Sequence, residues 1–337
     1  MNKVIELNRE YSTTRRVIRV TASEMAEVVR ETNGPEDKFE RQLFLPNSES
    51  RQGEGGLRTN GYFKEGALIS SPPTVEPSTE RNLSTLITIV TVVFNGEQLL
   101  EETILSIINQ DYNNVEYIII DGGSTDGTLD IIKRYEQVID YWVSESDSGI
   151  YDAMNKGVTL SLGDYVAFLN AGDTYNPKVL SKVALRKSEH VDIHFYSCEY
   201  WCSDSLQYIH TPKGSNKNEV MPHPSTFSKS KLFKIFGLFD LRYKVFSDAI
   251  WINEVKRNCL YSMHSEVSTK MICGGISSVI SFDFLLESYR FRRLSNGMIR
   301  SFAIGVFKPI LSCFASQIFG DHFYTISKKI INNEIYK

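Results

Sequence analysis

The run LITIVTVVF at residues 86–94, which ends at Asn95 and Gly96, decides the fold class of this chain. Every residue in the run is apolar or β-branched, and an Asn-Gly pair is a turn signal, so the run predicts a buried strand. Residues 97–110 then carry leucine and isoleucine at helical spacing, and residues 115–120 form a second short apolar run. The predicted order is strand, helix, strand.

The same alternation continues along the chain. The spacing predicts helices at 125–135 and 151–161 and strands at 139–143 and 165–169. Alternation of this kind indicates an α/β fold, in which a mostly parallel sheet has right-handed crossovers and helices on both faces.

The pattern changes after Pro177, where a helix to about residue 187 precedes strand-like runs at 193–201 and 206–211. We interpret these runs as the mixed half of the same domain. The resulting division is an extension at 1–83, one α/β domain at 84–280, and a helical tail at 281–337.

Composition excludes several classes of protein. Of 337 residues, 42% are hydrophobic and 23% are charged, which is typical of a soluble globular protein. The net charge of -4 argues against nucleic acid as a partner. Five cysteines, without paired CxxC motifs, favour a reduced chain. The first 30 residues are charged throughout, so no cleaved signal peptide is expected, and we predict a cytoplasmic protein.

The extension at 1–83 is polar, and we expect it to be largely irregular. Its fragment GEGGLRTNGYF, at residues 53–63, has two interpretations. We favour a surface linker with a local turn. The alternative is that its paired glycines lay backbone against the α/β domain.

Polar residues that follow the apolar runs are the candidate ligand contacts, because ligands of open parallel sheets bind beyond the carboxyl ends of the strands. Asn95 and Gly96 follow the first run, and DGGSTDGT follows the second at 121–128. Asp121 could accept from a base or a ribose, while a strand-to-helix turn with a capping residue is an equal alternative. Asp152 and Asn155 could face a diphosphate or a sugar, or could be part of a solvated helix face.

The segment NAGD at residues 170–173 ends a buried strand with polar groups. A carboxylate there can hold a divalent ion, which would neutralise the charge that grows on a departing nucleoside diphosphate.

These segments together resemble family 2 glycosyltransferases with the GT-A fold. DGGSTDGT is similar to the family's D-D/G-G-S-T-D-G-T signature, and NAGD follows it in the expected order. The resemblance covers about residues 84–280 and implies a nucleotide-sugar donor. It also implies donor-binding positions within these segments, which are Thr91, Phe94, Asn95, Asp121, Asp152, Asn155 and Asn170.

The segment NAGD occupies the place of the family's D-x-D motif but departs from it. Asn170 stands where the first aspartate is usual, and Gly172 where the metal-holding aspartate often lies. The resemblance therefore leaves Asp173 as the metal ligand, for Mg²⁺ or Mn²⁺. Family branches that act in polysaccharide assembly resemble this chain in the same Asn-x-Gly-Asp form.

The second half of the domain also resembles the family, through MPHPSTF at 221–227, GLFD at 237–240 and YKVFSDAIW at 243–251. The resemblance implies an inverting transfer with Asp248 as the general base. A helix cap is the alternative for Asp248. His223 could order the acceptor or touch the diphosphate, or could be a structural histidine.

Basic and apolar residues are mixed in the tail, among them Arg290, Arg300 and Lys308. This mixture suits peripheral contact with an anionic membrane, and a helix packed on the domain is the alternative. The resemblance implies a saccharide or polyprenyl-linked acceptor in bacterial exopolysaccharide, O-antigen or colanic-acid-type assembly. That acceptor would place the protein at the cytoplasmic face of the inner membrane.

Two rival functions remain open at the level of sequence. A sugar nucleotidyltransferase shares a nucleotide-binding sheet, but it should carry a basic Gly-rich loop after the first strand, and Asn95-Gly96-Glu97 lacks the basic residue. A non-catalytic scaffold would explain the altered positions 170 and 172, while the presence of Asp173 and Asp248 argues against it.

Overall fold

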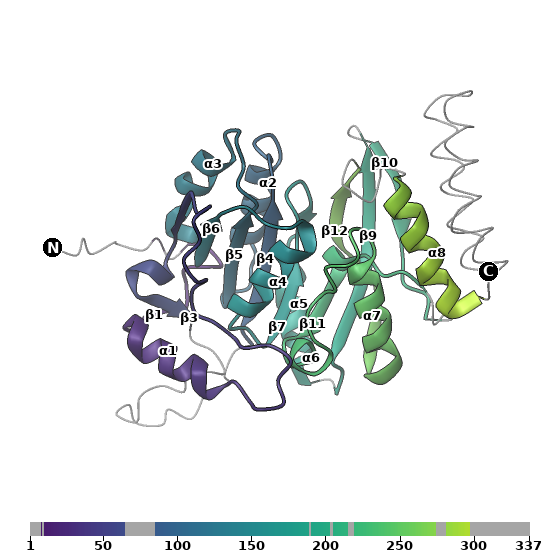
Figure 1. Cartoon of the computed structure of the whole chain (residues 1–337), viewed down its shortest axis with the longest axis horizontal. Helices are drawn as coiled ribbons and strands as arrows, with labels where there is room; N and C mark the ends of the chain where they lie inside the picture. The colour runs from purple at the N-terminus through teal and green to yellow at the C-terminus, as the bar shows by residue number, and fades with distance from the viewer. Residues whose placement is uncertain are drawn as a thin grey trace.

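A computed structural model describes residue 8 and residues 10–64, 85–188, 190–202, 205–214, 219–273 and 281–296. Within these ranges the centre of the molecule is a ten-stranded mixed sheet, ordered β2-β6-β5-β4-β7-β11-β9-β12-β8, with β10 paired to β9 (Figure 1). The strands in this order are β2 (Gly53–Gly55), β6 (Tyr141–Ser144), β5 (Val115–Asp121), β4 (Ile87–Val93), β7 (Tyr165–Phe168), β11 (Thr226–Lys229), β9 (Ile193–Cys202), β12 (Tyr261–Ile272), β8 (Thr174–Tyr175) and β10 (Ser205–His210).

The parallel half confirms the α/β fold predicted from the sequence. β4 pairs in parallel with both β5 and β7, and β5 pairs in parallel with β6. The crossovers contain α2 (Leu100–Ile108), α3 (Thr128–Arg134) and α4 (Ile150–Leu160). All seven residues of β4 are buried, as expected for a central strand with helices on both faces.

Alternate residues of β4 enter two different cores. Ile87 and Ile89 pack with α2, α3 and α5 (Val179–Leu185). Val90 packs on the other face with α4, α6 (Lys231–Phe236) and α7 (Ser247–Asn258). Successive side chains of a strand point to opposite faces, so β4 contributes to a core on each side of the sheet. The sheet is therefore the middle of three layers, and the carboxyl end of β4 lies between the helices of the two outer layers.

The other half of the sheet is mixed, as predicted. β11 runs antiparallel to β7 and β9, while β9 and β12 are parallel. Helix α8 (Phe282–Asn296) follows this half and lies at one end of the molecule (Figure 1). Within the described ranges, no helix combines the length and the apolar character needed to cross a bilayer. Residues 297–337, on which the membrane-contact prediction mainly rests, lie outside the described residues.

The extension contains more regular structure than the sequence indicated. β1 (Val17–Arg19) pairs with β3 (Tyr62–Lys64), and α1 (Ala22–Glu31) begins with a capping box at Thr21. The favoured interpretation of residues 53–55 as surface linker was wrong, because they form β2 and pair antiparallel with β6 at the edge of the main sheet. A short 3-10 turn at Arg58–Asn60 follows. The predicted domain boundary near residue 83 falls outside the described residues and stays a prediction.

The expectation of a fully reduced chain was also wrong. Cys202 and Cys273, at the ends of the parallel neighbours β9 and β12, are joined by a disulfide with their Cα atoms 5.1 Å apart. The sequence spacing of 71 residues hides this pair, because only the strand pairing brings the two thiols together. Cys198 is a buried free thiol and Cys259 a half-buried one.

Candidate functional site

The predicted base lies in the first turn of α7. One carboxylate oxygen of Asp248 accepts from the Tyr151 hydroxyl at 2.7 Å, and the other lies 2.9 Å from Nδ1 of His223. The Asp248 side chain is 15% exposed, so it is largely screened from solvent but still reachable. The N-cap of α7 is Phe246, and no side chain caps this helix. The geometry thus gives Asp248 partners other than those of a helix cap.

His223 connects Asp248 to the end of β7. Its Nε2 lies 3.1 Å from Nδ2 of Asn170. Because a carboxylate can only accept, the proton of a neutral His223 belongs on Nδ1, and Nε2 then accepts from the Asn170 amide. Asp248, His223 and Asn170 therefore form one continuous hydrogen-bonded row.

Hydrogen bonds control the charge of the Asp248 carboxyl. Burial by itself would raise its pKa, but the hydrogen bond from His223, helped by the Tyr151 hydroxyl, outweighs burial and lowers the pKa below its ordinary value. Burial and the Asp248 charge raise the pKa of Tyr151. Asp248 is thus an ionised acceptor at neutral pH, beside a tyrosine that keeps its proton.

Tyr151 was not singled out in the sequence. It is the second residue of α4, and an aromatic residue on an amphipathic helix is usually a core residue. Its hydroxyl has a second acceptor 2.8 Å away, the carbonyl oxygen of Val245. One hydroxyl proton therefore serves two acceptors, one of which is the candidate base.

Two residues with side-chain oxygens follow the end of β7, Asn170, a predicted donor contact, and Asp173, the predicted metal ligand. Oδ1 of Asn170 is buried and has no hydrogen-bond partner. Asp173 is 7% exposed and accepts from the amide of Ile272 at 3.1 Å. Burial raises the pKa of Asp173 to about 7, although the hydrogen bond from the Ile272 amide opposes this.

The amide oxygen of Asn170 and the carboxylate of Asp173 can supply part of the ligand shell of a hard divalent ion. Among the described residues, no three His, Cys, Asp or Glu side chains come together to form a metal site of their own. One carboxylate and one unpartnered amide oxygen suit an ion such as Mg²⁺, which typically takes one or two protein ligands and fills its shell with water and substrate phosphate.

The predicted donor contacts divide into exposed and buried groups. Phe94 is 65% exposed just after β4, and Asn95 beside it has a positive φ of 51°. The Asn95 side chain accepts from the amide of Thr125 at 2.9 Å, so it holds the loop after β5. Thr91 is fully buried and donates to the carbonyl of Leu169. Phe94 and Asn95 are thus presented at the strand ends, and Thr91 is turned into the core.

Asp121 also faces inward. It is 0% exposed and accepts from the amide and the hydroxyl of Ser124 and from the hydroxyl of Ser144. These bonds join the ends of β5 and β6. Asp121 therefore shapes the loop that follows it.

Asp152 and Asn155 lie on α4. Asp152 accepts from the amide of Ser148 at 3.0 Å and is partly exposed. Asn155 exchanges two hydrogen bonds with the backbone of Phe239, at 2.8 and 2.9 Å, and is 8% exposed. Asn155 thus fixes the loop that leads to α7.

Comparison with known proteins identifies relatives of this chain. The model of the family described as Glycosyl transferase family 2 matches residues 88–247. An uncharacterized glycosyltransferase of Mycobacterium tuberculosis is 30% identical over 179 residues, which are 49% of this chain and 67% of that protein. A PGL/p-HBAD biosynthesis glycosyltransferase of Mycobacterium bovis is 29% identical over 215 residues, 58% of this chain and 80% of the relative. A putative teichuronic acid biosynthesis glycosyltransferase of Bacillus subtilis is 36% identical over 104 residues, 30% of this chain and 41% of the relative.

Solved structures share the fold. S. aureus TarS 1–349 in complex with UDP has a TM-score of 0.52 at 14% identity, over 74% of this chain and 91% of that one. TarS 1–349 in complex with UDP-GlcNAc has a TM-score of 0.52 at 16% identity, over 70% of this chain and 73% of that one. A longer TarS chain is matched over 44% of its length.

Proposed function

This chain belongs to glycosyl transferase family 2 and is a glycosyltransferase, and we propose that it transfers a sugar with inversion, using Asp248 as the general base. The observation that carries the proposal is the row of Asp248, His223 and Asn170, which joins the start of α7 to the carboxyl end of β7. Ligands of open α/β sheets bind at that edge.

The chemistry requires one proton acceptor near the reacting hydroxyl. The acceptor oxygen forms a bond to the anomeric carbon while the bond from that carbon to the diphosphate breaks on the opposite face, so the configuration inverts. The hydroxyl proton passes to Asp248, and the bonding electrons leave with the nucleoside diphosphate. The lowered pKa keeps Asp248 ionised before this step.

Tyr151 and His223 can keep their hydrogen bonds to Asp248 whether its carboxyl group is ionised or protonated. While Asp248 is ionised, the Tyr151 hydroxyl donates to it at 2.7 Å. Once Asp248 is protonated, Tyr151 can turn its proton to the Val245 carbonyl, 2.8 Å away, and accept from the new acid. His223 donates from Nδ1 in either state and keeps the carboxyl oriented.

The diphosphate would lie near the end of β7. Asn170 Oδ1 and the Asp173 carboxylate would hold Mg²⁺ or Mn²⁺, which when bound supplies charge neutralisation for the leaving diphosphate. An ionised Asp173 next to a cation would no longer have the raised pKa that it has by itself.

The nucleoside would lie across the ends of β4 and β5. The exposed ring of Phe94 can pack against a base, and the Asn95 side chain keeps the 121–128 loop beside it. In this proposal Asp121 keeps that loop in place from its buried side. Asn155 holds the loop before α7, and Asp152, on α4, faces the diphosphate or the sugar.

The acceptor is proposed from the names of the relatives, which refer to PGL/p-HBAD biosynthesis and teichuronic acid biosynthesis. We propose a saccharide or polyprenyl-linked saccharide of a bacterial surface polymer, used at the cytoplasmic face of the membrane.

The test is a panel of UDP-, GDP- and dTDP-sugars with the native chain, Asp248→Asn and the matched control Glu254→Gln, an exposed residue of the same helix. Each is assayed with and without Mg²⁺ or Mn²⁺, and the product anomer is read by NMR. We expect one donor to be turned over with inversion, loss of turnover in Asp248→Asn with donor binding retained, and normal turnover in Glu254→Gln. Full activity in Asp248→Asn would refute the assignment of the base. Well-folded protein that binds no nucleotide sugar would favour the scaffold.

A further inference from the structure

The backbone just before α7 is held by a side chain from α8. Glu287 accepts hydrogen bonds from three consecutive amides, those of Lys244 at 2.7 Å, Val245 at 2.9 Å and Phe246 at 3.0 Å. Glu287 is 4% exposed. Successive backbone amides that point to one place form an anion-binding turn. Here the bound anion is the carboxylate of Glu287, a side chain of the same protein.

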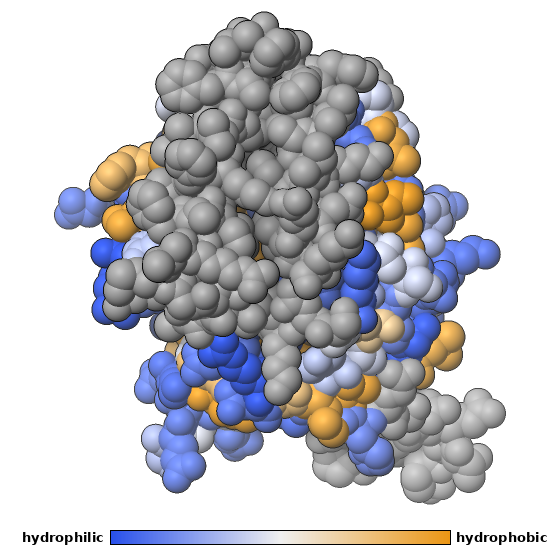
Figure 2. All heavy atoms as spheres, turned by 90° about the vertical axis from the view of Figure 1, so that its right-hand side faces the viewer, coloured by the Kyte–Doolittle hydropathy of each residue, from blue (hydrophilic) through white to orange (hydrophobic). Residues whose placement is uncertain are grey.

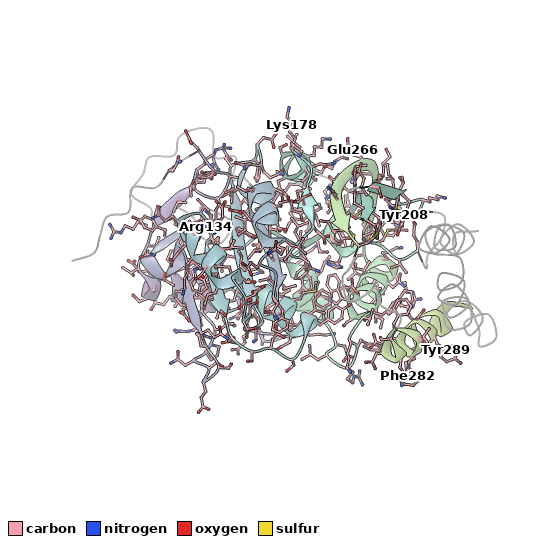
Figure 3. The ribbon with its side chains drawn as sticks, turned by 90° about the horizontal axis from the view of Figure 1, so that it is seen from above. Arg134, Lys178, Tyr208, Glu266, Phe282 and Tyr289 are labelled. Carbon is pink, nitrogen blue, oxygen red and sulfur yellow. A yellow bond between two sulfur atoms is a disulfide. The ribbon has the colours of Figure 1, made fainter. Side chains whose placement is uncertain are left out.

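Ring contacts add to this connection. The Phe246 ring lies 5.4 Å from that of Phe284 and 5.8 Å from that of Phe291, both on α8. The segment 244–246 is therefore bound to α8 through its backbone and through one side chain. Figure 3 shows α8, with Phe282 and Tyr289 labelled on it, at one end of the molecule.

The same segment reaches the candidate base directly. Val245 offers its carbonyl to the Tyr151 hydroxyl, which also donates to Asp248. Phe246 is the N-cap of α7, and Asp248 lies in the first turn of that helix. A shift of the 244–246 backbone would thus move both Asp248 and the hydroxyl that orients it.

We propose that Glu287 is a positioning residue for sugar transfer, which holds the 244–246 backbone so that Asp248 is aligned with the acceptor hydroxyl. The inference rests on the proposed function of Asp248. It also lies beyond the matched family stretch, which ends at residue 247, so it assigns a role to a helix that this stretch does not include.

The test compares Glu287→Gln and Glu287→Ala with a matched control on the same helix. Glutamine has nearly the same shape but only one acceptor oxygen, so it cannot accept from all three amides. Asp283→Asn is the control, because Asp283 contacts Lys244 only through an exposed salt bridge of 3.0 Å, with side chains 44% and 71% exposed.

We expect kcat to fall about a hundredfold in Glu287→Ala, as a small misplacement of a catalytic group can cause. Glu287→Gln should lose less, Asp283→Asn should stay close to native, and KM for the donor should change little in all three. Hydrogen exchange of the 244–246 amides should accelerate in the same order as kcat falls.

Several outcomes would overturn the proposal. One is native kcat in Glu287→Gln together with fast exchange at 244–246, which would show that the contact is structural only. Another is a loss of kcat that follows the loss of folded protein, measured by thermal unfolding, with no effect in the folded fraction. Asp248→Asn is run beside these variants. If it retains activity, the base assignment fails, whereas loss in Asp248→Asn with none in either Glu287 variant refutes only the role of Glu287.

Discussion

The guanidinium of Arg58 lies 2.7 Å from the carboxylate of Glu116, and each side chain is 1% exposed. Arg58 also donates to the carbonyls of Leu43 and Leu160, and Glu116 accepts from Thr88 and from the amide of Leu162. A second buried pair, Lys64 with Asp140, is 3.0 Å long. The extension thus supplies two cations to carboxylates inside the α/β domain.

Arg58→Ala should lower the free energy of unfolding by about 3–5 kcal/mol, because it leaves the Glu116 charge buried and unpaired. Arg134→Ala is the control, since its pair with Glu101 is 59% and 42% exposed and should be worth about 0–1 kcal/mol. Urea unfolding of both variants measures the difference. Equal small effects would mean that Arg58 does not neutralise a buried charge.

His223→Asn should shift the pH profile of the enzyme. With the His223 hydrogen bond gone, burial dominates and the pKa of Asp248 rises, so the acidic limb of kcat/KM moves to higher pH. At neutral pH we expect about a tenfold loss, part of the roughly 10²–10⁴ that a positioned base contributes. Tyr151→Phe removes the hydrogen bond from the Tyr151 hydroxyl, which lowers the pKa of Asp248 less than His223 does. The acidic limb of kcat/KM should therefore shift less in this variant. An unshifted limb in His223→Asn would contradict the row of hydrogen bonds.

Asp173→Asn should change how stability depends on pH. The pKa of Asp173 is raised from 3.8 to about 7, so its contribution favours folding below about pH 4 and is lost as pH rises through 7. We expect the variant to melt several degrees above the native chain at pH 8 and close to it at pH 4. Mg²⁺ or Mn²⁺ should raise the native melting temperature at pH 8 and leave the variant unchanged. Identical pH dependence of the two proteins would refute a raised pKa.

Cys202→Ser should lower the free energy of unfolding by about 2–4 kcal/mol under oxidising conditions, since the disulfide restrains a long loop of the unfolded chain. Reductant should lower the native melting temperature to that of the variant. Cys259→Ser should melt like the native chain both with and without reductant, because it removes a free thiol and leaves the Cys202–Cys273 bond in place. Labelling of Cys202 and Cys273 in unreduced protein would show that the bond does not form.

The parallel strands could be predicted because each is a continuous apolar run between turn signals. Residues 86–94, 115–120 and 165–169 correspond to β4, β5 and β7. β2 could not be predicted, since Gly-Glu-Gly has neither length nor apolar content and becomes a strand only by pairing with β6. Glycine there is required, because a Cβ on Gly55 would lie 2.8 Å from Nε1 of Trp142.

The candidate site shows a similar division. The motif order singled out Asp248 and His223, 25 residues apart, and the structure places them in contact. The sequence places Asp121 at a strand end, but this position does not tell whether the side chain points toward a ligand or into the protein. Asp121 faces inward because two serine hydroxyls and an amide bind it there. Glu287 had no signal in the sequence, as a carboxylate on a mixed helix is ordinarily solvated.

In Figure 2 the orange apolar side chains of the described residues are interspersed with blue polar ones on the face that it shows. Phe282, on α8, is among the most exposed large apolar residues described, at 79%. Scattered exposure of this kind is ordinary for a protein surface.

The short strand β2 forms one edge of the main sheet. An open sheet edge invites pairing with the edge of another molecule, and natural proteins limit this with very short or charged edge strands. β2 has three residues, and its central Glu54 is exposed. Beneath it, all four residues of β6 are buried. A chain shortened to begin after β2 would present β6 as its edge, so shortened preparations should self-associate into aggregates even where the remaining domain still folds.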